Sequence, residues 1–190
     1  MPDLTDLLAG PVLEVAPRLL GARFEHGGVV VRITEVEAYD GPDDPGSHAH
    51  RGLTPRNEVM FGPPGHLYTY FTYGMHWCSN VVTGPEGRAS AVLLRAAEVV
   101  DGLDLARERR PRSSDRDLAR GPARMCRAMA IGREQNGLDL SGHLGLEPPT
   151  GKVSTGPRVG LRLAADRPWR FWLTDDPTVS RYVPAKRTTR

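Results

Sequence analysis

The amino-acid sequence predicts a single domain of the α+β class. Its 190 residues are enough to bury one core, and a hydrophobic content of 39% with a charged content of 25% is ordinary for a folded protein. Many β-rich runs and a few separate helical segments follow one another, which is typical of an α+β fold. Neither an internal repeat nor a low-complexity linker divides the chain, so we expect one domain over residues 1–190.

Hydrophobic spacing predicts the elements of the first part of the chain. Residues 4–20 have apolar residues at helical spacing, with a break at Gly10-Pro11. GVVVRITEVEAY at 28–39 is rich in β-branched residues and predicts a strand. Residues 40–65 are rich in proline and glycine and therefore predict a loop.

The same signals predict the remaining elements. HLYTYFTY and WCSNVV predict two strands with Gly74 at the turn between them, and ASAVLLRAAEVV predicts another buried strand. The charged segment 104–120 predicts a mobile loop with some helix. Pro122 at a helix start predicts a helix over 121–131, and residues 158–173 are expected to complete the fold as a hairpin.

Basic residues are unevenly distributed and are almost all arginines. Net charge is only +2, yet of the 25 basic residues only Lys152 and Lys186 are lysines, which leaves 23 arginines. Residues 107–133 carry nine arginines against three acids, and the segment after Asp176 carries Arg181, Lys186, Arg187 and Arg190 without an acid. Because the arginine fork suits phosphate oxygens, these side chains are candidates to contact a nucleic-acid backbone. A solvated helix face combined with a compositional bias towards arginine accounts for the pattern equally well.

The sequence lacks the signals of secretion, membrane insertion and disulfide chemistry. Its start, MPDLTDLL, has no basic region followed by an apolar stretch, and no apolar run approaches the roughly 20 residues of a membrane span. Cys78 and Cys126 lack CxxC spacing, so we expect buried, reduced thiols and no structural zinc. We expect a cytoplasmic protein without membrane contact, or a nuclear one if the source is eukaryotic.

Two carboxylates lie two residues apart on the strand predicted at 28–39. Glu35 and Glu37 then point to the same side of the sheet, and repulsion between close carboxylates can create a general base. An exposed strand face, or one structural carboxylate that caps a neighbouring loop, is the commoner meaning of such a pair. A metal site that combines them with His48 and His50 is conceivable but has no specific pattern. We expect neither a metal nor a cofactor.

The predicted hairpin is rich in tyrosine. Tyr68 and Tyr70 lie on one strand face, and Tyr68 suits a core position as well as a site. Tyr73 lies beside the turn at Gly74, where a ring has little core to enter, and the turn returns Asn80 to within a residue or two of Tyr70. Rings beside an amide and acid–base groups are what a site needs to hold a nucleobase and to do hydrolytic chemistry on it.

Taken together, these segments resemble the alkyladenine (3-methyladenine) DNA glycosylase family of base-excision repair. The segments that carry the resemblance are EVEAYDGPDDPGSHAH, TPRN, PPGHLYTYFTYGMHWCSNV, VLLRAAE, GPARMCRAMAI, RVG and PWRF, in this order. The resemblance implies a compact domain with a curved antiparallel sheet, flanking helices and a protruding β-hairpin. It also implies a monomeric, monofunctional enzyme that flips damaged (alkylated or deaminated) purines out of double-stranded DNA and hydrolyses the N-glycosidic bond.

The resemblance also assigns roles in catalysis and base binding. Glu37 would be the general base that deprotonates the attacking water, and Arg95 would help to hold that water and the carboxylate. Tyr39 and His48 would stack on or bond to the extruded base, and Tyr70 would lie on its other face.

Two further roles concern selectivity and DNA distortion. Asn80 would border the base and disfavour the exocyclic amino group of guanine. Tyr73 would be the wedge that enters the duplex where the base has left it. The loop between His48 and Thr54 is slightly shorter than the family pattern, which affects the mouth of the pocket and hence the range of lesions.

Three other functions stay open. Bifunctional glycosylases of the formamidopyrimidine type use an N-terminal proline amine, which Pro2 would supply after loss of Met1, but they also carry a four-cysteine zinc finger. A damage-sensing DNA-binding module or an RNA-binding domain would use the tyrosines as stacking platforms. Glu37 and Arg95 argue against a pure binder, because a carboxylate in the pocket weakens the binding of a negatively charged ligand.

Overall fold

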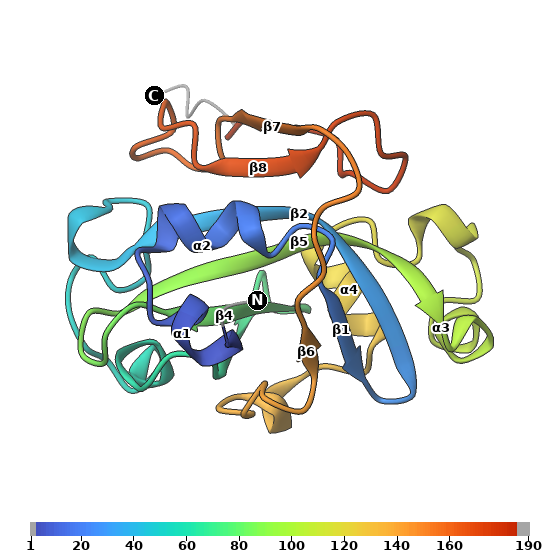
Figure 1. The fold of residues 1–190 in the computed structure, drawn as a ribbon, viewed down its shortest axis with the longest axis horizontal. Helices are drawn as coiled ribbons and strands as arrows, with labels where there is room; N and C mark the ends of the chain where they lie inside the picture. The colour runs from blue at the N-terminus through green and yellow to red at the C-terminus, as the bar shows by residue number, and fades with distance from the viewer. Residues whose placement is uncertain (1–2, 186–190) are drawn as a thin grey trace.

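One curved antiparallel sheet organises the protein, whose computed structural model describes residues 3–185 (Figure 1). Its eight strands pair in the order β3-β4-β5-β2-β1-β6, while β8 pairs with both β2 and β7. The strands are β1 (Arg23–His26), β2 (Val29–Asp40), β3 (Leu67–Thr72), β4 (His76–Thr83), β5 (Ser90–Asp101), β6 (Leu144–Gly145), β7 (Val153–Gly156) and β8 (Arg170–Leu173). This arrangement confirms the predicted α+β class.

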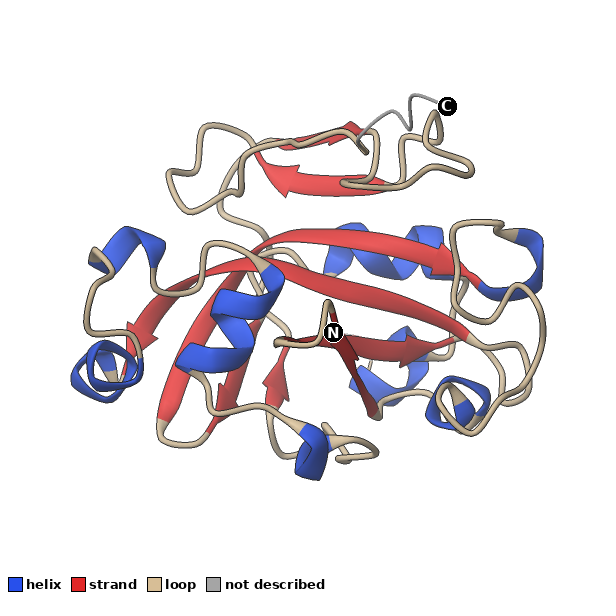
Figure 2. Cartoon of the chain, turned by 180° about the vertical axis from the view of Figure 1, so that it is seen from behind, coloured by secondary structure: helices blue, strands red, loops and turns tan. Residues whose placement is uncertain are grey.

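Short helices surround the long strands, as Figure 2 shows. They are α1 (Leu4–Leu8), α2 (Val12–Arg18), α3 (Leu103–Arg109) and α4 (Pro122–Ala128), with 3-10 turns η1 (Gly41–Asp43), η2 (Glu58–Phe61), η3 (Asp115–Asp117) and η4 (Arg133–Gln135). Over the described residues, no helix has the length and apolar character that crossing a membrane requires.

The main core lies between the sheet and helices α2 and α4. Helix α2 packs on β2 and β5, and α4 packs on β4 and β5. Phe24 and Ile33 from the sheet are fully buried in the same cluster as Leu19 and Met125 from the helical segments. Burial of an apolar side chain of this size contributes about 1.5–3 kcal/mol, so this cluster fixes the sheet on which the site is built.

Strand β2 is paired along both edges, and three of its polar side chains, Thr34, Glu35 and Glu37, are fully buried. One edge pairs with β5, and the other pairs first with β1 and then with β8. Glu35 and Glu37 face β5 at Ala96 and Leu93, with a register irregularity on either side of Glu35. In Figure 1 the β7–β8 layer lies along β2 on the side away from β3 and β4.

The predicted hairpin forms from β3 and β4. Tyr68 pairs with Asn80 and Tyr70 with Cys78, so Asn80 returns to the predicted distance from Tyr70. Tyr73 at the turn has a left-handed φ of 51°, a conformation that few residues other than glycine adopt. The hairpin is therefore confirmed, whereas its protrusion from the domain stays a prediction.

The C-terminal hairpin was misplaced by the sequence pattern. Its strands are β7 and β8, so residues 157–169 form the connection between two strands and not a strand. RVGLRL alternates apolar and polar residues as a strand does, but Arg158 points inward to bind Asp44. Arg158 is buried and Leu163 is 59% exposed, so the alternation does not mark a sheet face.

The other predicted elements form close to their expected places. The helix over 4–20 breaks at Gly10-Pro11 into α1 and α2, and Pro122 is the first residue of α4. The charged segment predicted as a loop with some helix begins with α3. Within this helix Arg107 forms ion pairs with Asp104 and with Asp115 beyond the helix end.

Candidate active site

A cavity of about 360 Å³ lies between the hairpin, the end of β2 and two loops. Its lining includes every residue with a predicted site role except Glu37. The lining residues are Tyr39, Gly46, Ser47, His48, Met60, Tyr68, Tyr70, Thr72, Tyr73, His76, Cys78, Asn80, Leu93, Arg95, Pro122, Ala123, Val159, Gly160 and Leu161. The fold thus brings together side chains from β2, the β3–β4 hairpin and β5.

One wall of the cavity is aromatic. His48 and Tyr70 pack edge to face, with their ring centroids 4.5 Å apart and their ring planes at 82° to each other. Tyr68 lies 5.7 Å from Tyr70 and places its hydroxyl 3.4 Å from His48 Nδ1. Tyr68 is also only 1% exposed, so it serves the core and the cavity at once.

The aromatic groups are neutral hydrogen-bonding partners near neutral pH. Burial, followed by the negative charge of Glu37, raises the pKa of Tyr39 well above its ordinary value. Burial and then neighbouring Cys78 also raise the pKa of Tyr70. Although its side chain reaches solvent, His48 has a pKa lowered by desolvation and by the positive charge of Arg56. The wall therefore presents rings and hydroxyls without charge.

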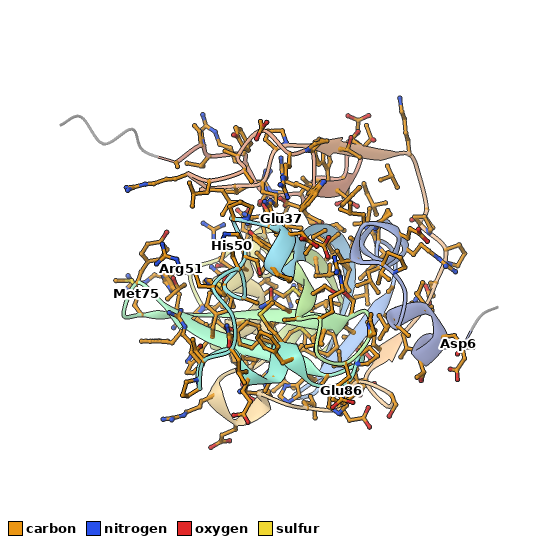
Figure 3. The ribbon with its side chains drawn as sticks, turned by 90° about the vertical axis from the view of Figure 1, so that its left-hand side faces the viewer. Asp6, Glu37, His50, Arg51, Met75 and Glu86 are labelled. Atoms are coloured by element: carbon orange, nitrogen blue, oxygen red, sulfur yellow. The ribbon has the colours of Figure 1, made fainter. Side chains whose placement is uncertain are left out.

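Glu37 lies directly behind this cavity and is fully buried. Its Oε2 accepts a hydrogen bond from the Tyr39 hydroxyl at 2.8 Å, and its Oε1 accepts one from the Val159 amide at 2.6 Å. Arg95 Nη1 lies 3.4 Å from Oε1. Tyr39 and Arg95, which both contact this carboxylate, line the cavity, and Figure 3 shows Glu37 beneath the β7–β8 layer.

Glu35 has a different environment although it also contacts Arg95. Its Oε1 accepts bonds from Arg95 at 3.0 Å and Arg170 at 2.7 Å, and its Oε2 accepts the Ser180 amide at 2.6 Å. Burial raises the pKa of Glu35, but Arg95 and Arg170 outweigh it and leave this pKa below the ordinary value. Glu35 is thus a structural carboxylate that caps the segment around Ser180, as one interpretation of the sequence allowed.

The proposed selectivity and wedge residues lie at different depths. Asn80 is 5% exposed and donates from Nδ2 to the Tyr68 carbonyl at 3.2 Å, which fixes its amide against the cavity. Tyr73 is 86% exposed and borders the cavity from the hairpin turn. Met75, 67% exposed, follows it at the free end of the hairpin, as labelled in Figure 3.

The carboxylates are already engaged by protein donors, and His50 contacts a main-chain carbonyl instead. Its side chain is exposed, and its Nδ1 lies 2.8 Å from the Pro42 carbonyl. Over residues 3–185, no three histidine, cysteine, aspartate or glutamate side chains gather as metal ligands would. The combination of Glu35, Glu37, His48 and His50 considered from the sequence is therefore not assembled.

Several arginines of the 107–133 segment bind the protein itself. Arg109 donates to the carbonyls of Ala128 and Gly27, and Arg110 donates to those of Asp117 and Leu118. Arg110, Arg124 and Arg127 line a second cavity beside the hairpin, where burial and then the charges of Arg124 and Arg127 lower the pKa of Arg110. Contact with phosphates stays a prediction, and Lys186, Arg187 and Arg190 lie outside the described residues.

The sequence patterns missed the residues that support the glutamates and the strand segment that carries them, all but Asp44 from the far end of the chain. These are Asp44, Arg158, Val159, Arg170 and Ser180. The RVG and PWRF segments include Arg158, Val159 and Arg170, so their presence in the resemblance was the available signal.

The fold and the cavity define a class of site: a ring-lined space for a planar group, with a buried and hydrogen-bonded carboxylate behind one wall. The family model described as Methylpurine-DNA glycosylase (MPG) matches residues 6–177 of the chain. The chain belongs to this family, and it is a DNA glycosylase, a hydrolase that acts in the repair of alkylated bases.

Curated relatives agree with the family match. The chain is 54% identical to a protein of Frankia casuarinae, an alignment that covers 98% of this chain and 95% of the relative. It is 52% identical to a protein of Streptomyces avermitilis, covering 99% and 98%, and 53% identical to one of Leifsonia xyli, covering 93% and 91%. Each relative carries the provisional name 3-methyladenine DNA glycosylase.

Proposed function

We propose that the enzyme turns a damaged purine out of double-stranded DNA into the ring-lined cavity and hydrolyses its N-glycosidic bond with water activated by Glu37. The observation that carries the proposal is the buried Glu37 carboxylate directly behind Tyr39 and Arg95, which both line the cavity. A base inside a duplex cannot reach such a carboxylate, so the nucleotide must first leave the stack.

The cavity suits a planar base that carries positive charge. Alkylation of a purine ring nitrogen makes the base cationic, and a cation is attracted to the faces of electron-rich rings such as Tyr39 and Tyr70. A neutral His48 avoids repelling that charge, which agrees with the lowered pKa of its imidazole.

The chemical step needs one water molecule and one acceptor for its proton. The water oxygen forms a bond to the sugar C1′, its proton passes to Glu37, and the bond from C1′ to the purine breaks with its electron pair on the base. An alkylated base, cationic beforehand, leaves as a neutral molecule, whereas a neutral damaged purine leaves as an anion that takes up a proton from solvent. Arg95 and the Tyr39 hydroxyl contact the carboxylate, so they orient it towards a water between them.

The hairpin and Asn80 complete the proposal. Tyr73 enters the stack where the base has left, and an inserted side chain of this kind holds distorted DNA. Asn80 faces the purine edge and disfavours the 2-amino group of guanine. Each of these groups comes from one chain, so the enzyme acts as a monomer at damaged DNA.

Glu37→Gln is the decisive test. The change keeps the side-chain volume and an acceptor oxygen but removes the basic group, so base release should fall at least about 100-fold. Binding to lesion DNA should persist. The assay is single-turnover release from duplexes with 3-methyladenine-type damage, hypoxanthine or ethenoadenine. Release by the variant within a few-fold of wild type would move the general base elsewhere, and binding without release by the wild type would favour a damage-sensing module.

A further inference from the structure

Arg158 is a large charged side chain that is almost fully buried. Its Nη1 and Nη2 bind the two oxygens of Asp44 at 2.5 and 2.8 Å, and both side chains are fully buried. Two parallel bonds between a guanidinium and a carboxylate fix their relative orientation as well as their distance. Asp44 is itself fixed, because its oxygens also accept the amides of Gly46 and Asp40.

The guanidinium of Arg158 also holds the strand segment that carries Glu37. It lies between two rings, 4.6 Å from the centroid of Tyr39 and 5.1 Å from that of Trp169. Its Nη1 donates to the carbonyl of Ala38 at 2.9 Å. Ala38 is the residue between Glu37 and Tyr39, so one side chain fixes the main chain and the Tyr39 ring together.

Both uncharged groups that donate hydrogen bonds to Glu37 are held beside Arg158. The Tyr39 hydroxyl, at 2.8 Å, belongs to the ring under the guanidinium. The Val159 amide, at 2.6 Å, belongs to the residue that follows Arg158 in the chain. The Asp44 end of the pair joins this arrangement to the loop that leads to His48 at the cavity wall.

We infer that the buried Arg158–Asp44 pair is a positioning device that holds the Tyr39 hydroxyl and the Val159 amide on the Glu37 carboxylate. Arg158 is buried and is not among the residues that line the cavity. The inference rests on the proposed function, because it concerns the orientation of Glu37 towards water.

Arg158→Lys tests the inference with little change in charge. Lysine can keep one contact with Asp44 but cannot form two parallel bonds or stack flat on Tyr39. A displacement of catalytic groups by about 1 Å can lower a rate up to about 100-fold, so the single-turnover rate of base release should fall about tenfold or more. The dissociation constant for lesion duplex should stay within about threefold, because the variant retains every side chain that contacts the base or the duplex.

Arg167→Lys is the matched control. Arg167 also lies over the Trp169 ring, at 4.5 Å, and approaches Asp44 at 3.9 Å, but its contacts do not include Ala38 or Tyr39. The same substitution there should leave the release rate within about twofold. Equal losses in the two variants, or a normal rate in Arg158→Lys, would overturn the inference.

A double-variant cycle separates positioning from general damage to the fold. Tyr39→Phe keeps the ring and removes the hydroxyl bonded to Glu37. If Arg158 acts through that hydroxyl, Tyr39→Phe should slow release less in the Arg158→Lys background than in wild type. Losses that simply multiply would overturn the inference.

Thermal melting and the release rate of the wild type keep these outcomes distinct. Thermal melting reports whether each variant folds, and if Arg158→Lys does not, Asp44→Asn takes its place because it leaves Arg158 one acceptor and removes the second. A wild-type enzyme that releases no base would refute the proposed function. A wild type and folded pair variants that all release base at the same rate would refute the inference alone.

Discussion

Glu35 and Glu37 show how two residues of the same type on one strand take different tasks. Both are fully buried and both contact Arg95. Glu35 is enclosed by two arginines and the Ser180 amide, whereas Glu37 has two uncharged donors and one more distant arginine. The first arrangement neutralises a charge, and the second leaves a carboxylate beside a cavity.

Glu35→Gln should therefore act on stability. Removing one partner of a buried ion pair typically costs about 3–5 kcal/mol, because the guanidinium groups of Arg95 and Arg170 keep their burial and lose their counter-charge. Urea unfolding at pH 7 measures this loss, with Glu37→Gln as the matched control that should lose less. Equal stability of Glu35→Gln and wild type would contradict the role.

The same network predicts how stability depends on pH. The pKa of Glu35 is lowered in the folded protein, so the unfolded chain binds its proton more readily at acidic pH. The stabilisation is present above the unfolded pKa of about 4.3 and is lost as pH falls through the folded pKa. The difference in the free energy of unfolding between wild type and Glu35→Gln, measured by urea unfolding, should therefore narrow below about pH 4.

Asn80→Ser should widen the substrate range. The amide is fixed by the Tyr68 carbonyl and lines the cavity, so shortening it opens space at the purine edge. Release of guanine-type bases should rise relative to adenine-type bases, measured as single-turnover rates on matched duplexes. Adenine-type release by the same variant is the control. If guanine-type release stays flat while that activity survives, Asn80 does not set selectivity.

At the scale of the elements, the turn of the β3–β4 hairpin holds the aromatic side chain of Tyr73 in an exposed position. Tyr73 adopts a left-handed φ of 51° and Gly74 one of 67°. Such a conformation in a non-glycine residue costs of the order of 1–3 kcal/mol, and strain of this kind clusters at functional sites. The turn therefore keeps the ring in solvent, available to DNA.

Tyr73→Ala should weaken binding to a lesion duplex about tenfold or more, since stacking of one ring contributes about 1–3 kcal/mol. Binding to a lesion in single-stranded DNA should change little, because an unpaired strand has little stacking to replace. Phe71→Ala is the matched control: Phe71 is 45% exposed on the same hairpin but packs 5.2 Å from Trp77. Equal losses on both DNA forms would show that Tyr73 does not act as a wedge.

At the scale of the whole molecule, the scarcity of amines predicts a monofunctional enzyme, because the chain has two lysines. Strand cleavage by a glycosylase needs an amine that forms a Schiff base with the sugar. Lys152 is exposed and is not among the cavity residues, while Pro2 and Lys186 lie outside the described residues. Borohydride added to enzyme and lesion DNA should trap no covalent complex, and the product should be an intact abasic site. A trapped adduct that vanishes when Pro2 is changed would instead favour the bifunctional mechanism.

Local sequence signals predicted what depends on local structure. Gly10-Pro11 divides α1 from α2, β-branched and apolar runs predict β2 and β5, and Gly74 places Tyr73 at a turn. Such signals could not predict the contacts that hold the site, because the two residues of each contact lie far apart in the chain. Arg158 binds Asp44 across 114 residues, and only the folded sheet decides that Arg158 turns inward.

The distance between Glu37 and Val159 has a consequence for the newly made protein. Their hydrogen bond joins residues 122 positions apart, and the Ser180 amide reaches Glu35 across 145. Synthesis on the ribosome runs from the N-terminus, so the hairpin and β5 emerge long before these donors exist. Until then Glu37 lacks the hydrogen bond from the Val159 amide, so a nascent chain does not have the complete site. Activity should therefore appear late during translation, after the β7–β8 layer has docked on β2.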